Sequence, residues 1–224
     1  MQSSPSEPPI GQRLQQSFYD RPTATVAREL IGMLLLHRLA AVTNAAVTNA
    51  AAIDPENSPW VGGRIVETEA YLAERDLASH SSRGLTPSNR SMFQAAGTFY
   101  VYPIHAKHCL NAVTEANGVG AAVLIRAIEP LWGLSWMQTR RGQQDPLKLT
   151  RGPAMLAQAL AITRDDDGRC LVTDPDLGIF SNQQTKPPTV KRTVRIGVSK
   201  SKSRLLRFVD QHSKYLSRPF SKRR

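Results

Sequence analysis

The sequence predicts an α+β fold, a single domain built around an antiparallel β-sheet. Segments with strand character outnumber segments with helical character. The two kinds do not alternate regularly along the chain, as they would in a doubly wound parallel fold. No convincing internal boundary divides the 224 residues, a length that suits one large domain. We therefore expect one domain over residues 17–218, between two tails.

The first part of the chain predicts a tail, a helix, a strand and an insert. Residues 1–16 are polar and rich in Ser, Pro and Gln, which is typical of a disordered tail. A helix is expected at 19–32, with Pro22 in its first turn, and a buried strand at 33–39. An imperfect AAVTN repeat then indicates a variable insert near residues 40–62, a loop between two strands.

The next strand, expected at 64–71, would carry two acids and a tyrosine on one face. Its first set of alternating residues is Ile65, Glu67, Glu69 and Tyr71, and its second set is Val66, Thr68, Ala70 and Leu72. The second set would pack into the core. Two like charges at this spacing repel each other, and a solvated face with salt bridges to Arg or Lys would explain them from the spacing alone.

The second half of the chain predicts four more strands and two helices. The strands are expected at 97–104, 121–130, 193–199 and 205–210, and the helices at 131–142 and 151–162. The strand before the first of these helices should end at Pro130, and Leu131, Leu134 and Met137 should then point inward from the helix. Pro153 suits the first turn of the second helix. Residues 219–224 would form a basic tail.

Charge and cysteine content limit the class of protein. The formal net charge is +11, which favours a polyanionic partner such as DNA, RNA or an anionic membrane. A basic tail on an unrelated enzyme is the alternative. Cys109 and Cys170 are the two cysteines, too few for a disulfide framework or a four-cysteine zinc site. The chain has no signal-peptide pattern and no apolar run of membrane-spanning length, so we expect an intracellular protein.

A carboxylate flanked by aromatic residues in a basic protein suggests cleavage of a nucleoside C–N bond. That reaction passes through an oxocarbenium-like state at the sugar, as in glycoside hydrolysis. An anion stabilises this state and can take a proton from the attacking water. Glu69 would supply the acid, while Tyr71, Tyr102 and His80 could hold the face of a base that has left the stack. Ordinary strand packing is the commoner role of such tyrosines.

Seven motifs follow one another along the chain and point to one family. They are GRIVETEAYL, ASHSSRG, TPSNRSMF, GTFYVY, HCLN, LIRAIEPLWG and GPAMLAQAL. Together they resemble the alkyladenine (3-methyladenine) DNA glycosylase family, of the monofunctional kind. The late RIGV, LLRF and YLSR resemble its closing strands, so the resemblance covers roughly residues 18–218 apart from the insert. Several motifs in register are far stronger than any single short match.

The resemblance implies a fold and a function. The fold would be a curved antiparallel sheet with a protruding hairpin and peripheral helices. The function would be DNA repair by a glycosylase that flips and hydrolytically excises alkylated or deaminated purines from duplex DNA and leaves an abasic site. Its substrates would be of the 3-methyladenine, 7-methylguanine and hypoxanthine class. It would need no metal or other cofactor, would not act on membranes, and would be a monomer.

The resemblance also assigns roles to residues. Glu69 matches the carboxylate that activates water, and Arg126 matches an arginine close to it. Asn111 matches the asparagine whose bulk disfavours the exocyclic amino group of guanine. The walls around the flipped base would be Tyr71, His80 and Tyr102. Glu67 receives no role beyond support of the local hydrogen-bond network.

The hairpin after YVY departs from the family pattern. The family usually has a tyrosine at the hairpin tip that enters the minor groove where the base has left. Here the chain reads YVYPIHAKHCLN, one residue shorter. His105 is the better positional match for the wedge and Ile104 the other candidate. Either is suitable, because an intercalating side chain needs bulk more than a particular group.

Other contacts and functions stay open at this point. Candidate phosphate-binding residues are Lys107, Arg140, Arg141 and Arg151, with the region 191–207, although each could be a solvated surface charge. His105, His108 and Cys109 are possible zinc ligands, so a metal-dependent hydrolase with Glu69 as its base is one alternative. A non-catalytic RNA-binding protein is the other. A carboxylate on its binding face would, however, repel phosphate.

Overall fold

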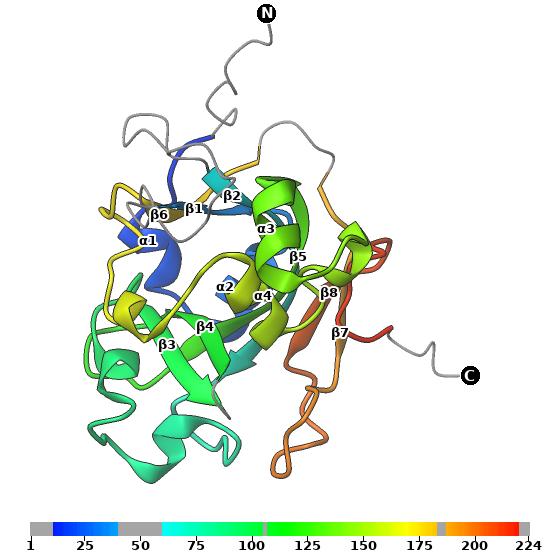
Figure 1. The fold of residues 1–224 in the computed structure, drawn as a ribbon. Coiled ribbons are helices and arrows are strands. Elements are labelled where there is room, and N and C mark those ends of the chain that lie inside the picture. Colours follow the sequence, from blue (N-terminus) through cyan, green and yellow to red (C-terminus); the bar gives the residue numbers. More distant parts are fainter. Residues whose placement is uncertain (1–10, 40–59, 105–106, 183–186, 220–224) are drawn as a thin grey trace, which may run out of the picture.

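The computed structural model describes residues 11–39, 60–104, 107–182 and 187–219. Its centre is a strongly curved sheet in which every strand pair is antiparallel (Figure 1). The strands are β1 (Leu34–Arg38), β2 (Trp60–Tyr71), β3 (Phe99–Ile104), β4 (Lys107–Val113), β5 (Ala122–Trp132), β6 (Leu177–Phe180), β7 (Val190–Thr193) and β8 (Arg207–Asp210). The main path runs β3-β4-β5-β2-β1-β6, and the β7–β8 hairpin joins it through β8. The predicted α+β fold with an antiparallel sheet is confirmed.

Strand β2 is the centre of this sheet. One edge pairs with β5 from Gly62 to Tyr71. The other edge is shared, because β1 pairs with its first half and β8 pairs with Glu67–Glu69 in its second half. Both acids of the strand therefore lie where β2 has a neighbour on each side. Both side chains are buried.

Helices cover one face of the sheet. They are α1 (Gln16–Tyr19), α2 (Thr23–Glu29), α3 (Leu134–Arg141) and α4 (Pro153–Ala159). Val26 of α2 and Leu156 of α4 belong to the main hydrophobic core. The hydroxyl of Thr68 donates a 2.7 Å hydrogen bond to the carbonyl of Ala27, which fixes β2 to α2. The predicted helices at 19–32 and 151–162 are both present, in shorter form.

The alternation along β2 is interrupted just before the two acids. Ile65 and Ala70 belong to the main core, although they have opposite parity. Val66 instead belongs to a separate small cluster. That cluster is formed by Val66, Ala127, Val209 and Leu216. The register with β5 shifts on both sides of Glu67, as at a β-bulge, which re-aims the following side chains. The prediction that Ile65 shares the face of the acids is therefore wrong.

Two predicted strands have different bounds. β5 continues past Pro130 to Trp132, because Pro130 pairs with Gly63 beside a register shift, a place where a sheet tolerates a missing N–H. Leu131 is consequently a strand residue with 43% exposure instead of an inward helix residue, whereas Met137 is buried as predicted. The strand predicted at 193–199 is wrong beyond Thr193, where β7 ends and a turn begins.

The two ends and the insert are only partly described. Within the expected tail, Leu14 is buried and its N–H donates to the carbonyl of Ile179 in β6, so residues 11–16 are packed on the domain. β2 begins at Trp60, which takes residues 60–62 out of the expected insert. Residues 1–10, 40–59 and 220–224 lie outside the described residues. No helix of the described part is both long and apolar enough to cross a membrane.

A buried histidine lies in β1, far from the acids of β2 in sequence. Nδ1 of His37 donates to the carbonyl of Leu160 at 2.8 Å, and Nε2 lies 3.3 Å from Nη1 of Arg169. Because an arginine nitrogen can only donate, Nε2 must accept, and the ring is neutral. Burial lowers the pKa of His37 from its ordinary value of 6.5.

We expect this histidine to make the fold less stable in acid. As the pH falls below 6.5, the unfolded chain binds a proton at His37 and the native chain does not. The contribution of His37 to the free energy of unfolding is therefore complete above that pH and decreases as the pH falls. The loss is at most about 1.4 kcal/mol per pH unit. Urea unfolding at pH 7.5 and 5.5 should show a smaller pH dependence for His37→Gln than for the parent. An equal dependence would contradict this assignment.

Candidate active site

Glu69 lies at the centre of a buried hydrogen-bond network. Its side chain is 0% exposed, so the solvated face that the spacing allowed is excluded. Oε1 accepts a 2.7 Å hydrogen bond from the backbone N–H of Ile196. Oε2 accepts from the Tyr71 hydroxyl at 2.9 Å and from Nη1 of Arg126 at 3.2 Å. Tyr71 is two residues further along β2, which places both side chains on the same face.

The surroundings of Glu69 strengthen it as a base. Burial raises the pKa of this carboxyl, and this effect outweighs the lowering by Arg126, by the Ile196 N–H and by Tyr71. A buried carboxylate with a raised pKa and a specific charge partner is typical of a functional site. Such a group takes up a proton more readily than a solvated glutamate, as a general base must.

Arg126 of β5 joins Glu69 to the second acid. Its Nε donates to Oε1 of Glu67 at 2.8 Å, and its Nη1 donates to Glu69. Glu67 is also 0% exposed. Burial alone would raise the pKa of Glu67, but the hydrogen bond from Arg207 and the charges of Arg126 and Arg207 outweigh it, and the pKa is lowered. The two neighbouring acids thus differ in proton affinity.

The ring of Tyr71 rests on a buried ion pair. The guanidinium carbon of Arg195 lies 4.6 Å from the centroid of this ring. Arg195 donates to both carboxylate oxygens of Asp76 at 2.6 Å, and both side chains are 0% exposed. Arg195 directly precedes Ile196, whose N–H binds Glu69. This explains why residues 193–199 do not continue as a strand, because the turn places both residues against the site.

Two adjoining cavities open beside Tyr71. The larger has a volume of about 520 Å³ and the smaller about 70 Å³. The lining of the smaller contains five residues that the sequence singled out, namely Tyr71, His80, Tyr102, Ile104 and Asn111. It also contains four that sequence reasoning did not name for the site, namely Met92, Tyr100, Cys109 and Leu124. Tyr71, His80, Tyr102 and Ile104 line the larger cavity as well.

The aromatic residues of the cavity contact one another. The ring centroids of His80 and Tyr102 are 4.0 Å apart, and Nδ1 of His80 lies 2.9 Å from the Tyr100 hydroxyl. Burial, and to a smaller extent the charge of Arg83, lower the pKa of His80. The imidazole is therefore neutral at physiological pH, and it adds no positive charge to the cavity.

Asn111 is held rigidly in the wall of the smaller cavity. The residue is buried in β4, and its Nδ2 donates to the carbonyl of Tyr100 at 2.9 Å and to that of Cys109 at 3.4 Å. These bonds join the side chain to the backbone of both β3 and β4. A side chain fixed in this way presents a constant shape to whatever occupies the cavity.

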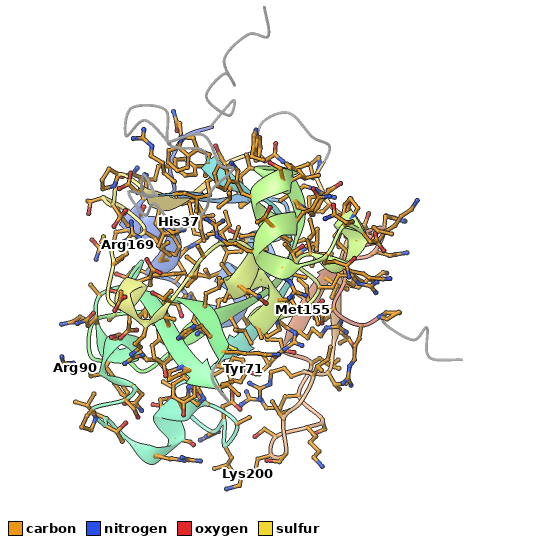
Figure 2. All side chains as sticks on the ribbon, in the orientation of Figure 1. His37, Tyr71, Arg90, Met155, Arg169 and Lys200 are labelled. Atoms are coloured by element: carbon orange, nitrogen blue, oxygen red, sulfur yellow. The ribbon has the colours of Figure 1, made fainter. Side chains whose placement is uncertain are left out.

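The predicted wedge and phosphate contacts are only partly brought to the cavities. Ile104 lines both cavities and is 42% exposed, whereas His105 lies outside the described residues. Lys107 is exposed at the start of β4 in the same hairpin. Arg140 and Arg141 belong to α3 and line neither cavity; α3 lies in the upper half of the view in Figure 1, whereas Lys200 is at the bottom of the same view in Figure 2.

Other basic residues lie closer to the cavities than the predicted arginines of α3. Arg151 donates to the carbonyl of Leu216 and does not line either cavity. Arg83 and Lys200 line the larger cavity. Arg83 lies inside the ASHSSRG motif, and Lys200 belongs to the region 191–207 that the sequence had already offered for phosphate contacts.

The metal site considered from the sequence has no ligand set in the described part of the chain. Burial raises the pKa of the Cys109 thiol to about 11, which disfavours the thiolate that a metal needs. No group of three or more His, Cys, Asp or Glu side chains arranged to hold a metal ion occurs among the described residues, which do not include His105. Cys109 instead forms part of the wall of the smaller cavity.

Comparison with known proteins connects this geometry to one family. The model of the family described as "Methylpurine-DNA glycosylase (MPG)" matches residues 51–214. A relative in Rhodopirellula baltica is 46% identical over 211 residues, which are 92% of this chain and 83% of the relative. A relative in Methanoculleus marisnigri is 44% identical over 209 residues, 92% of this chain and 98% of the relative.

A third relative, in Myxococcus xanthus, is 42% identical over 186 residues, 83% of this chain and 81% of the relative. All three carry the name "Putative 3-methyladenine DNA glycosylase". The resemblance drawn from the seven motifs is confirmed. Since the family model and the relatives each match well over half of its length, this chain belongs to the methylpurine-DNA glycosylase family.

Proposed function

We propose that this protein is a monofunctional DNA glycosylase that removes alkylated and deaminated purines from duplex DNA and leaves an abasic site. The substrates are of the 3-methyladenine, 7-methylguanine and hypoxanthine class. The observation that carries the proposal is the buried Glu69, whose pKa is raised and whose carboxylate is bonded to a tyrosine that lines a cavity. The protein acts as a monomer, in the compartment that holds the DNA.

Glu69 acts on both the sugar and the water. As the glycosidic bond breaks, its carboxylate stabilises the positive charge that develops on the sugar. It then takes a proton from the water whose oxygen forms the new bond to C1′. The base leaves with the electron pair of the C–N bond. Among the described residues that bond to Glu69, none carries an amine nucleophile, which favours direct hydrolysis over a Schiff-base step.

The smaller cavity receives the flipped base. The rings of Tyr71, His80 and Tyr102 supply flat surfaces for it. A cationic base such as 3-methyladenine is already a good leaving group and departs as a neutral molecule. The neutral His80 does not repel it. Asn111 stands in the wall, where its bulk excludes the exocyclic amino group of guanine.

DNA binds across the mouth of the larger cavity. Arg83 and Lys200 contact phosphates there, and the net charge of +11 attracts the duplex. Ile104 or His105 enters the gap left by the base, His105 being the better match in sequence to the wedge position. An RNA-binding protein without catalysis would have no use for the acid of β2.

Replacing Glu69, the proposed general base, should abolish catalysis but not the binding of DNA. We expect Glu69→Gln to lower the release of 3-methyladenine from methylated duplex DNA by about 10²-fold or more, because the amide cannot accept the proton of water. Single-turnover release of free base and a separate DNA-binding assay measure the two properties. Glu74→Gln, which removes an exposed acid of the following loop, is the matched control. Near-normal release by Glu69→Gln would remove Glu69 from the mechanism.

A smaller residue at position 111 should relax selectivity. We expect Asn111→Ser to raise the excision of guanine relative to hypoxanthine by roughly 10-fold or more, since a steric contact in a binding site contributes about 1–3 kcal/mol. Asn117→Ser changes the same residue type in an exposed turn and should keep the parent ratio. If Asn111→Ser excises hypoxanthine normally with an unchanged ratio, Asn111 does not exclude guanine.

Shortening the exposed side chain of the hairpin should weaken base flipping. The flipped state must be held against restacking, which is favourable by a few kcal/mol and least so for mispaired bases. We therefore expect Ile104→Ala to slow release of hypoxanthine opposite cytosine more than opposite thymine. A fluorescent base beside the lesion reports flipping directly.

Leu131→Ala is the control for this variant, because Leu131 is equally exposed at 43% but lies on β5 outside both cavity linings. Ile104→Ala with parent fluorescence and parent rates would leave His105→Ala as the variant that identifies the wedge.

A further inference from the structure

Glu67 takes no part in the mechanism above, yet its carboxylate accepts four hydrogen bonds, against three at Glu69. Its Oε1 accepts from Nε of Arg126 at 2.8 Å, from Nε of Arg207 at 2.8 Å and from the Ser217 hydroxyl at 2.7 Å. Its Oε2 accepts from the backbone N–H of Ser217 at 2.6 Å. A fully buried carboxylate with this many donors is fixed in one orientation.

The donors reach Glu67 from three separate elements. Arg126 is on β5 and Arg207 on β8, the two strands that flank this part of β2. Ser217 belongs to the segment after β8. That segment is held in turn by Arg207, whose Nη2 donates to the carbonyl of Arg218 at 2.6 Å, and by Arg151, whose Nε donates to the carbonyl of Leu216 at 2.9 Å.

The position of Arg126 at Glu69 depends on Glu67. The guanidinium is planar and rigid, so the hydrogen bond of its Nε to Glu67 sets the direction of its Nη1. That Nη1 is the atom that lies 3.2 Å from Oε2 of Glu69. Without Glu67, the second hydrogen bond would lose the contact that orients it.

The charges of the buried network also connect Glu67 to Glu69. The network contains two carboxylates and two guanidinium groups, and Arg207 bonds to Glu67 but to no oxygen of Glu69 among the described contacts. The negative charge of Glu67 thus pairs with the positive charge of Arg207, while Glu67 and Glu69 together pair with that of Arg126. The remaining charged or titratable groups that face Glu69 are Tyr71, Cys109 and Arg195, and Arg195 is paired with Asp76.

We propose that Glu67, held by Ser217, is a positioning residue that fixes Arg126 against Glu69 and balances the charge of Arg126 and Arg207. This inference rests on the proposed function, because it concerns the same hydrolysis. If Glu67 were neutral, two arginine charges would act on Glu69 alone. They would stabilise its anion and make it a weaker base. The opposite directions of the two pKa values, lowered at Glu67 and raised at Glu69, agree with this division.

The pH profile of base release tests the proposal. Duplex DNA carrying 7-methylguanine is the substrate, because this base is already cationic and its departure needs no proton, so the acid limb of the profile reports Glu69. We expect Glu67→Gln to move that limb to lower pH by about 1 unit, since removal of a like charge lowers the pKa of Glu69. The rate on the plateau should fall several-fold, because the base is weaker and Arg126 is less well oriented.

The matched control is Glu129→Gln. Glu129 also joins β5 to β2, through a 2.9 Å hydrogen bond from Nε of Arg64, but it makes no contact with Glu67 or Glu69 among the described bonds. The Glu129→Gln variant removes one negative charge from the same pair of strands. It should leave the acid limb of the pH profile and the plateau rate of base release unchanged. Glu67→Asp keeps the charge and should keep the limb at the parent pH.

Ser217→Ala gives a second measurement that does not remove the buried charge. It deletes the hydroxyl that donates to Glu67 and that accepts a 3.4 Å hydrogen bond from Nη2 of Arg126, and it keeps the backbone donor to Glu67. We expect the plateau rate of base release to fall several-fold and the acid limb to stay at the pH of the parent protein. If Glu67→Gln does not fold, as judged by its thermal melting, a parent plateau for Ser217→Ala overturns the inference.

Different results would overturn the proposed function and the role of Glu67. A parent protein that releases no methylated base overturns the proposed function. An active parent with the same acid limb and plateau as Glu67→Gln overturns only the role of Glu67. A limb that moves to higher pH would overturn the charge balance but support the positioning of Arg126, because it would mean that Arg126 has left Glu69.

Discussion

The architecture of this protein depends on the burial of two carboxylates on one strand. A buried charge without a partner costs several kcal/mol, so Glu67 and Glu69 require the arginines of the flanking strands. Arg126 and Arg207 can reach them only because β5 and β8 pair with β2 at the same place. The β-bulge at Glu67 turns the acids away from the helix-covered core while Ile65 stays in it. The pairing of β5 and β8 with β2 is therefore what allows the two acids to be buried as a charged network.

The site also links two kinds of support that act on different parts of the reaction. Arg126 and Glu67 approach Glu69 from within the sheet, while the turn after β7 supplies the N–H of Ile196 and the guanidinium under Tyr71. The first group sets the charge around the acid. The second sets the height and tilt of the aromatic surface. If a flipped base stacks on Tyr71, as proposed, the bonds from Arg126 and Ile196 fix the position of Glu69 relative to it.

Local sequence pattern was sufficient where local forces decide the structure. The strand predicted at 205–210 is present as β8, and the helix predicted at 151–162 is present as α4, with Pro153 in its first turn as expected. Local pattern did not predict the turn at 193–199, because Arg195 leaves the strand to pair with Asp76, 119 residues away. Family motifs located the cavity walls at Tyr71, His80 and Asn111. They could not show that Arg83 lines the larger cavity, or that Lys200 is the residue of the predicted region 191–207 that does so, since surface neighbours are a property of the folded chain.

The long sequence separations at Glu67 bear on how the protein folds. The bond from Arg126 spans 59 residues, the bond from Arg207 spans 140, and the bonds from Ser217 span 150. Closing such loops is entropically expensive and slow. Strand β2 can pair with β1 and β5 before β8 and the segment after it arrive. Glu67 is then left without its donors from Arg207 and Ser217, so the network around the two acids is complete only when contacts across most of the chain are in place.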